Sequence, residues 1–178
     1  MNITRYFLLT FAAVALFSVG AHGQARKKPV KRTTTVTKPA TMPPLDVRAA
    51  RVKVSNQLAN VSRFVNGLGP VGQAIEALDA EAKVKNLKKE SLDKNEADKQ
   101  RVVLAIRNLR EGMVKLESEF RVKPALKKYL PTIQGISTLA GQAEDSAVAG
   151  KLVAANSPLR SIQQKLTDTL AAMPNAEL

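Results

Sequence analysis

Six apolar residues between positions 102 and 120 recur at alternating steps of four and three, and this spacing restricts the fold more than any other feature. They are Val102, Ile106, Leu109, Met113, Leu116 and Phe120. Such a repeat places all six side chains along one stripe of an α-helix, as in the seam of a coiled coil. Lys123-Pro124 is expected to end this helix, because the residue before a proline is disfavoured in the helical region.

Similar stripes predict helices on both sides of this segment. A first helix is expected from residue 45 until Gly67, Gly69 and Pro70 stop it, and a second from about Val71. The turn after the second helix is placed between residues 88 and 99, where Ser91, Asp93 or Asn95 would cap the next helix. A kinked or restarted segment follows around Pro131, and a last helix starts at Ser157-Pro158, with Ser157 as its cap, and closes at Pro174.

The fold class predicted from these stripes is all-α. Short connections join antiparallel neighbours, so we expect an antiparallel bundle of four principal helices, with room for a fifth short helix near Pro131 and Gly150. The bundle occupies residues 45–178, a length that suits one hydrophobic core and therefore a single domain.

Residues 24–44 differ sharply from the predicted bundle. They contain six basic residues, no acid and four prolines. A stretch of this composition cannot bury enough apolar surface to offset its ordering entropy, so we expect a disordered basic arm. The cations of this arm are Arg26, Lys27, Lys28, Lys31, Arg32 and Lys38.

Residues 1–23 have the three parts of a secretory signal peptide: Arg5, an apolar run over residues 6–19, and small residues at Ala21-His22-Gly23. Cleavage is expected before Gln24, and the protein is expected in a periplasm or outside the cell. A bacterial source is favoured because an exported chain without cysteine does not use disulfides. The cations that follow the apolar run favour an alternative, in which residues 1–23 stay as a membrane anchor.

The residue inventory argues against catalysis. The chain has no Cys and no Trp, and its one histidine, His22, lies in the predicted signal peptide. A serine beside a lysine, Ser157 or Ser161 with Lys165, is the remaining nucleophile arrangement, but Lys165 lies on a polar helix face. No metal-ligand spacing or glycine-rich phosphate loop is present, so no metal, cofactor or small-molecule substrate is predicted.

Charge is the remaining functional signal. The net charge of +13 includes +6 from residues 24–44 and +6 from residues 45–178. The arm is expected to bind an anionic envelope polymer or membrane surface at low salt, or else to serve only as a soluble spacer. A second basic patch is a candidate at Lys85, Lys88, Lys89 and Lys94. Nucleic acid would bind only nonspecifically, because few aromatic residues are available for base stacking.

Together these features predict an exported, non-enzymatic helical-bundle interaction protein. Its arm would bind the anionic component, and its bundle another protein or a second copy through a helical seam. One alternative is a membrane-anchored structural protein that retains residues 1–23. A third is a periplasmic or secreted enzyme of unknown class.

Overall fold

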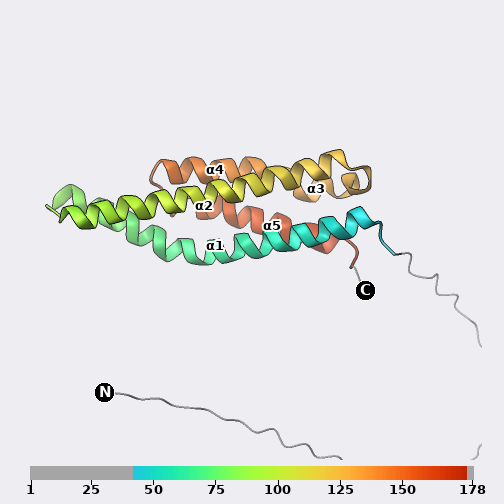
Figure 1. Ribbon diagram of the computed structural model, residues 1–178, viewed down its shortest axis with the longest axis horizontal. Coiled ribbons are helices and arrows are strands. Elements are labelled where there is room, and N and C mark those ends of the chain that lie inside the picture. Colours follow the sequence, from blue (N-terminus) through green and yellow to red (C-terminus); the bar gives the residue numbers. More distant parts are fainter. Residues whose placement is uncertain (1–41, 176–178) are drawn as a thin grey trace, which may run out of the picture. The chain divides into compact units, whose positions relative to one another are not determined.

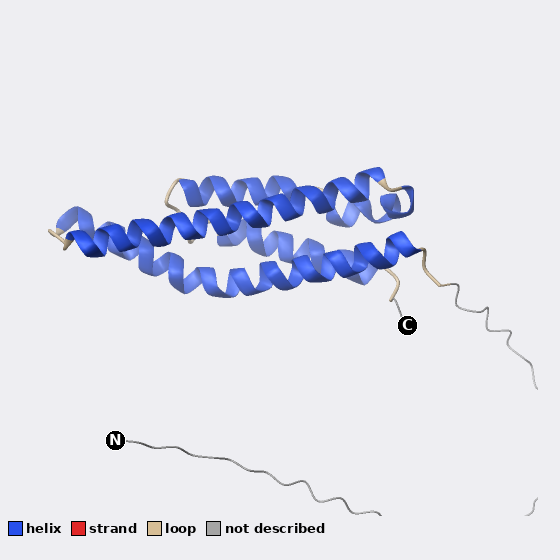
Figure 2. Cartoon of the chain, in the orientation of Figure 1, coloured by secondary structure: helices blue, strands red, loops and turns tan. Residues whose placement is uncertain are grey.

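The computed structural model describes residues 42–175, which lie within one compact unit, Ala40–Leu178. The predicted signal peptide and residues 24–41 of the predicted arm lie outside the described residues. The described part is all-helical, with five α-helices, one short 3₁₀-helix and no strand in residues 42–175 (Figure 2). The elements are α1 (Leu45–Val84), α2 (Lys89–Val122), η1 (Pro124–Tyr129), α3 (Leu130–Ile133), α4 (Ile136–Val148) and α5 (Asn156–Ala172).

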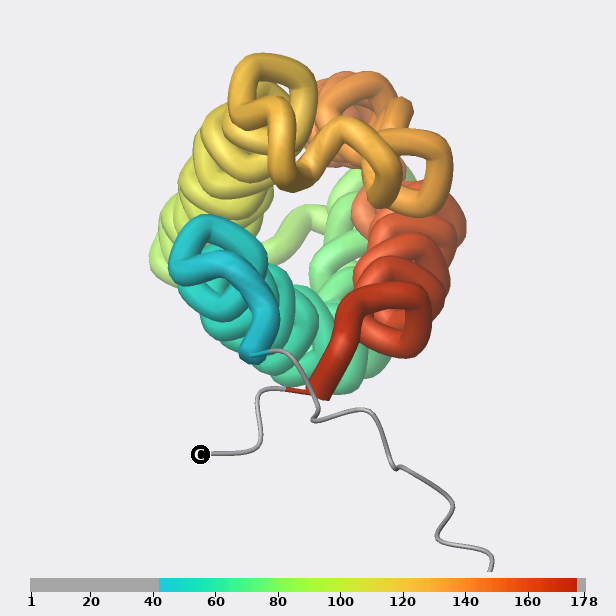
Figure 3. The backbone as a smooth tube through the Cα atoms, turned by 90° about the vertical axis from the view of Figure 1, so that its right-hand side faces the viewer, coloured from blue at the N-terminus to red at the C-terminus, as the bar shows by residue number. Residues whose placement is uncertain are grey.

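Four of these helices surround a common interior. Seen from one end, α1, α2, α4 and α5 follow one another around a ring, and η1 and α3 lie across the near end (Figure 3). α1 packs against α2 and α5, and α4 packs against the same two helices. α1 and α2 are much longer than α4 and α5, so part of the α1–α2 hairpin extends past the other two (Figure 1).

The interior is filled by the apolar stripes that the sequence pattern identified. On α2, Ile106, Met113, Leu116 and Phe120 are at most 4% exposed, which confirms the predicted seam. α1, the α3–α4 region and α5 supply the other walls of the core: Val47, Ala50, Val54, Val61, Val65, Leu68, Ile75, Leu126, Ile133, Ile136, Ala140, Ala143, Ala147, Leu152, Leu159, Ile162 and Leu166. Burial of this apolar surface is the main stabilising contribution to the fold.

The prediction that Gly67, Gly69 and Pro70 stop the first helix is wrong. α1 continues through them from Leu45 to Val84, and it changes direction near its middle, where proline is the usual cause of a kink (Figure 1). Pro70 and Asn66 are both exposed, so the Asn66 carbonyl that loses its helical donor can turn toward water. Leu68 and Gly72 are buried on the inner side, and packing there holds both halves in one helix.

Two predicted helix starts are also wrong. The first turn of α2 begins at Lys89, so Ser91, Asp93 and Asn95 lie inside the helix and do not cap it. α5 begins at Asn156 after Ala155, and Ser157 makes no side-chain cap. In both places the helix begins before the residues that the sequence suggested as its caps.

The other predicted helix boundaries agree better with the structure. α2 ends at Val122 before Lys123-Pro124. The expected restart near Pro131 appears as η1 followed by α3. Gly135 separates α3 from α4 with a φ of 89°, and Gly150 follows α4 with a φ of 74°. Residues with a side chain rarely adopt these angles, so the glycines allow the chain to turn at both ends of α4.

Candidate interaction surfaces

The connection between α4 and α5 marks the point at which the α1–α2 hairpin becomes uncovered. A Cβ atom on Gly72 would lie 3.1 Å from Leu152 Cβ, and the backbone N–H of Val153 donates to Glu76 Oε1 at 2.8 Å. Beyond Glu76 the hairpin extends past α4 and α5 (Figure 1, left). We call residues 77–99 the overhang. At 1.5 Å per residue its helical parts are about 12 Å long on α1 and about 16 Å on α2.

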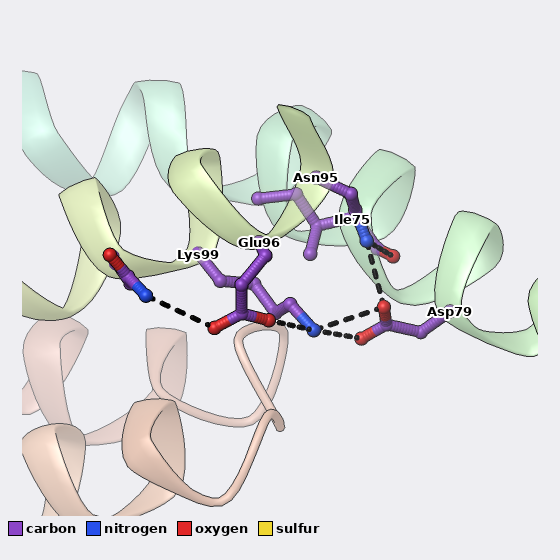
Figure 4. Close-up of polar contacts among 6 residues, drawn as sticks. Ile75, Asp79, Asn95, Glu96 and Lys99 are labelled. Carbon is purple, nitrogen blue, oxygen red and sulfur yellow. Dashed lines mark hydrogen bonds and ion pairs between the residues drawn. The ribbon is translucent and has the colours of Figure 1, made fainter. Parts of the chain in front are cut away.

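A polar cluster joins the two helices of the overhang (Figure 4). Asn95 is 7% exposed, and its Nδ2 donates to Asp79 Oδ1 at 2.7 Å and to the Ile75 carbonyl at 3.4 Å. Lys99 Nζ lies 3.1 Å from Asp79 Oδ1 and 3.0 Å from Glu96 Oε2. The Glu96 hydrogen bond raises the pKa of Lys99, with Asp79 acting in the same direction against partial burial. This cluster continues the inner stripes of both helices. We call the part in which α4 and α5 cover α1 and α2 the body; the stripes are apolar in the body and polar here.

A groove of about 680 Å³ lies beside the polar cluster, where the overhang meets the end of α4. We call it the corner groove. Its walls combine the cluster residues Asp79, Glu96 and Lys99 with apolar side chains of α2 and α4. Among the latter, Leu104 is 55% exposed and Val148 is 64% exposed. The corner groove therefore presents apolar surface next to charges of both signs.

A second groove of about 420 Å³ runs between α1 and α2. It contains the apolar residues Val71, Ile75 and Leu78, with Lys94 and Asp98 beside them. Val71 is 45% exposed. The hairpin thus has a second partly apolar surface that no other described helix covers.

The predicted secondary basic patch lies on the overhang. Lys85, Lys88 and Lys89 are exposed in and next to the turn between α1 and α2, and Lys94 is exposed on α2. Acids accompany these lysines, and Lys85 Nζ pairs with Glu81 Oε1 at 2.8 Å. The overhang contains six basic and six acidic residues, so its formal charge is zero. The four lysines therefore belong to a surface of mixed charge.

The opposite end of the described chain is cationic. Residues 42–54 and 117–129, which meet there, contain seven Lys or Arg and three acids, a formal charge of +4. Lys123 Nζ connects them through contacts of 2.8 Å with both Asp46 and Glu119, which raise the pKa of Lys123. Lys127 and Lys128 are exposed on η1. We call these residues the cationic end; the chain enters it from the predicted arm.

Glu117 lies on α2, and its buried carboxylate contacts the start of α4. Its residue exposure is 2%, and it accepts hydrogen bonds from the N–H groups of Gly135 and Ser137, from the Ser137 hydroxyl and from Arg121. Burial alone would raise the pKa of Glu117, but these donors outweigh it and lower the pKa to about 2. Because α4 has no side-chain cap of its own, Glu117 of α2 supplies an acceptor to its first turn. We interpret Glu117 as structural.

Glu144 forms a second inter-helix ion cluster. Arg107 Nε and Arg110 Nη1 of α2 lie 2.9 Å and 2.8 Å from its two carboxylate oxygens. Arg110 is the main cause of a lowered pKa of Glu144, followed by Arg107. Both oxygens are therefore engaged within the chain, and the cluster holds α4 against α2.

The Ser–Lys arrangement that the sequence left open is not assembled in residues 42–175. Ser161 Oγ donates to the Ser157 carbonyl at 3.2 Å, and neither serine has a hydrogen bond with Lys165 in this part of the chain. The same residues contain no group of three or more His, Cys, Asp or Glu placed to hold a metal ion. Within them, no helix combines the length and the apolar character needed to cross a membrane.

Sequence reasoning missed the polar cluster and both buried glutamates. A signal for the cluster was present, because Asp79 follows Ile75 by four residues, Lys99 precedes Val102 by three and Asn95 precedes Lys99 by four. Each polar residue therefore occupies the next position of an apolar stripe. Glu117 and Glu144 gave no such signal, because their partners come from distant segments.

Comparisons with family models, with curated proteins and with solved structures find no match to this chain.

Proposed function

We propose that the protein is an exported, non-enzymatic interaction protein built on an antiparallel bundle of four principal helices. Its basic arm and the cationic end bind a closely spaced array of anionic groups, on a membrane surface or an envelope polymer. The uneven charge distribution is the observation that supports this function most directly. The end that continues into the arm has a formal charge of +4, whereas the overhang has none.

The charges favour binding through one end of the molecule, the cationic end with the arm that precedes it. The six arm cations precede the cationic end in the chain, so one anionic surface can attract both. Each Lys or Arg near an anionic membrane contributes about 1 kcal/mol of attraction, and salt weakens this contribution. The contacts of Lys123 with Asp46 and Glu119 occupy part of the cationic end, which leaves the arm as the main source of affinity.

A charge-removal experiment tests the proposal. Six arm residues, Arg26, Lys27, Lys28, Lys31, Arg32 and Lys38, are changed together to glutamine, which keeps the length of the chain. Binding is measured by co-sedimentation with phosphatidylglycerol vesicles, and separately with the soluble polyanion teichoic acid, over a series of salt concentrations. We expect the variant to lose at least about a hundredfold in affinity at low salt for the anionic probe that the arm recognises.

A matched variant controls for the general loss of positive charge. Lys85, Lys88, Lys89 and Lys94 are changed to glutamine instead, and we expect their loss to change affinity only slightly, because acids of the overhang neutralise them. Binding that does not depend on salt, or that survives loss of the arm cations, would contradict the proposal. Loss of binding to vesicles alone, or to the polymer alone, identifies the anionic partner.

Export is tested separately by the intact mass of the protein from each cell fraction. A species that begins near Gln24 in a periplasmic or extracellular fraction supports the proposal. A membrane species that retains Met1 would instead support the anchored structural protein, with the arm next to the membrane.

A further inference from the structure

We propose that two copies of this chain pair through their overhangs, so that the two α1–α2 hairpins pack antiparallel to each other. This inference goes beyond the proposed function and does not depend on the arm. The overhang of each copy lacks the two helices that α4 and α5 supply to the body. A second hairpin, turned by a two-fold rotation, supplies two helices at that place. The same surface then serves both partners, as in any isologous interface.

Charge favours a second copy over a polyanion or a strongly charged partner at this surface. Residues 45–178 have a formal charge of +6, and the overhang contributes none of it. Two cationic copies repel each other least where this neutral, mixed-charge segment is in contact. Its tip, residues 81–91, contains four lysines and two acids, whereas its base, residues 77–80 and 92–99, contains two lysines and four acids. An antiparallel two-fold pairing therefore places the cationic tip of each copy over the anionic base of the other.

The base of the overhang gives the interface a defined register. Asp79, Asn95 and Lys99 lie together there (Figure 4), and Asp79 and Lys99 line the corner groove. In the proposed dimer each cluster faces the tip of the other hairpin, and the symmetry axis passes midway along the overhangs, near residues 82 and 93. Charged groups at fixed positions in a helical contact select which residues pair, at some cost in stability.

Exposed apolar side chains lie where the partner would make its contacts. The tip of one hairpin, with Val84 at 80% exposure, reaches the corner groove of the other, where Leu104 and Val148 lie. Two helices side by side are about 20 Å wide and the overhang is about 14 Å long, which gives roughly 300 Å² of flat area per copy before the groove walls are added. That is below the roughly 800 Å² per partner of a standard interface, so we expect a weak, concentration-dependent dimer.

Sedimentation equilibrium of the full chain over a concentration series tests the pairing. We expect the apparent mass to rise from 19.2 kDa toward twice that value as concentration increases. Leu104→Glu is expected to raise the dissociation constant of the dimer at least about tenfold, because it places a charge against an apolar contact. Val122→Glu is the matched control on α2, since Val122 is 72% exposed outside the overhang. Circular dichroism establishes that both variants keep their helical content.

A cysteine cross-link locates the interface, because the natural chain has no cysteine and any disulfide must join two copies. Asp93→Cys places a thiol near the proposed axis, and Ser118→Cys places one on the same helix outside the overhang. We expect oxidation to form disulfide dimers much faster with Asp93→Cys. A chain that stays monomeric at about 100 μM, an equal effect of the two glutamate variants, or preferential cross-linking at Ser118→Cys overturns the proposal.

This test is separate from that of the proposed function. The glutamine variant of the arm is expected to dimerise as the natural chain does, and Leu104→Glu is expected to keep its salt-dependent binding to anionic probes. Association caused by the apolar residues 6–19 would not respond to Leu104→Glu. It would therefore count against pairing through the overhang.

Discussion

The body and the overhang contain parts of the same two helices, α1 and α2, in two different surroundings. In the body, α1 and α2 pack against α4 and α5, and their inner stripes are apolar and buried. In the overhang the same stripes continue as Asp79, Asn95 and Lys99, which satisfy one another by hydrogen bonds and ion pairs. The inner stripe is apolar where α4 and α5 of the same chain cover it permanently, because burial is what makes apolar residues stabilising.

Shortening one leucine in each region should give the largest difference in unfolding free energy between the body and the overhang. Leu116 and Leu92 both lie on α2 and are 4% and 39% exposed. Leu116→Ala leaves a cavity in the core, so we expect it to lower the free energy of unfolding by about 2–5 kcal/mol. Leu92→Ala should cost less than about 1 kcal/mol. Urea unfolding at low protein concentration measures both, and equal losses would contradict the division into covered and uncovered regions.

Acid should act on the body mainly through Glu117. Its pKa is lowered to about 2 in the folded chain, whereas an unfolded glutamate titrates near 4.5. The folded state therefore holds this proton less tightly, and the associated stability is present above about pH 4.5 and is lost as the pH falls toward 2. We expect roughly 3 kcal/mol from this group.

Unfolding free energies of Glu117→Gln between pH 2 and 6 should lack this part of the pH dependence. The exposed Glu111→Gln is the control and should follow the natural chain. If Glu117→Gln kept the full acid sensitivity, the buried carboxylate would not be its source.

Two glycines of α1 test where the α4–α5 connection packs against this helix. A Cβ on Gly67 meets nothing within 4 Å, whereas one on Gly72 lies 3.1 Å from Leu152 Cβ and 3.4 Å from the Leu152 backbone. Gly67→Ala should stabilise the chain by about 0.5–1 kcal/mol. Gly72→Ala should be less stable than Gly67→Ala by about 1–3 kcal/mol, because the α4–α5 connection must move. Thermal unfolding compares the two, and equal midpoints would place that connection farther from α1.

The smallest expected difference lies inside the overhang. Asn95→Ala removes the hydrogen bonds to Asp79 and Ile75 and should cost about 1 kcal/mol. Lys85→Ala removes an exposed pair with Glu81 and should cost less than about 0.5 kcal/mol. Amide hydrogen exchange of residues 77–99 should accelerate in the first variant only. Acceleration in both would mean that the turn, and not the polar cluster, holds the hairpin together.

Periodicity predicted much of the helical structure because it depends only on local spacing. The stripe from Val102 to Phe120, the end of α2 at Lys123-Pro124 and the interruption near Pro131 all follow from side-chain geometry within a few residues. The failure at the first helix has a tertiary cause. Gly67, Gly69 and Pro70 are strong helix breakers in isolation, yet buried Leu68 and Gly72 hold α1 continuous across them.

The candidate surfaces depended more heavily on tertiary structure. Lys85, Lys88 and Lys89 are close together in the sequence, so their proximity at the turn of the hairpin needed no tertiary structure. Their neutral surroundings required the structure, because it is the folded hairpin that brings the acids of α1 and α2 together. The corner groove could not be expected from either helix alone, since it exists only where α4 ends beside α2.

The sequence by itself determined that this chain is helical and where most of its buried stripes lie, because apolar spacing is a property of neighbouring residues. Only the tertiary structure decided that α1 is one continuous helix, that Glu117 caps a helix from another segment, and that the α1–α2 hairpin extends past its cover. These features depend on residues far apart in the chain, and the free energy of packing them together outweighs local preferences of about 1 kcal/mol per residue.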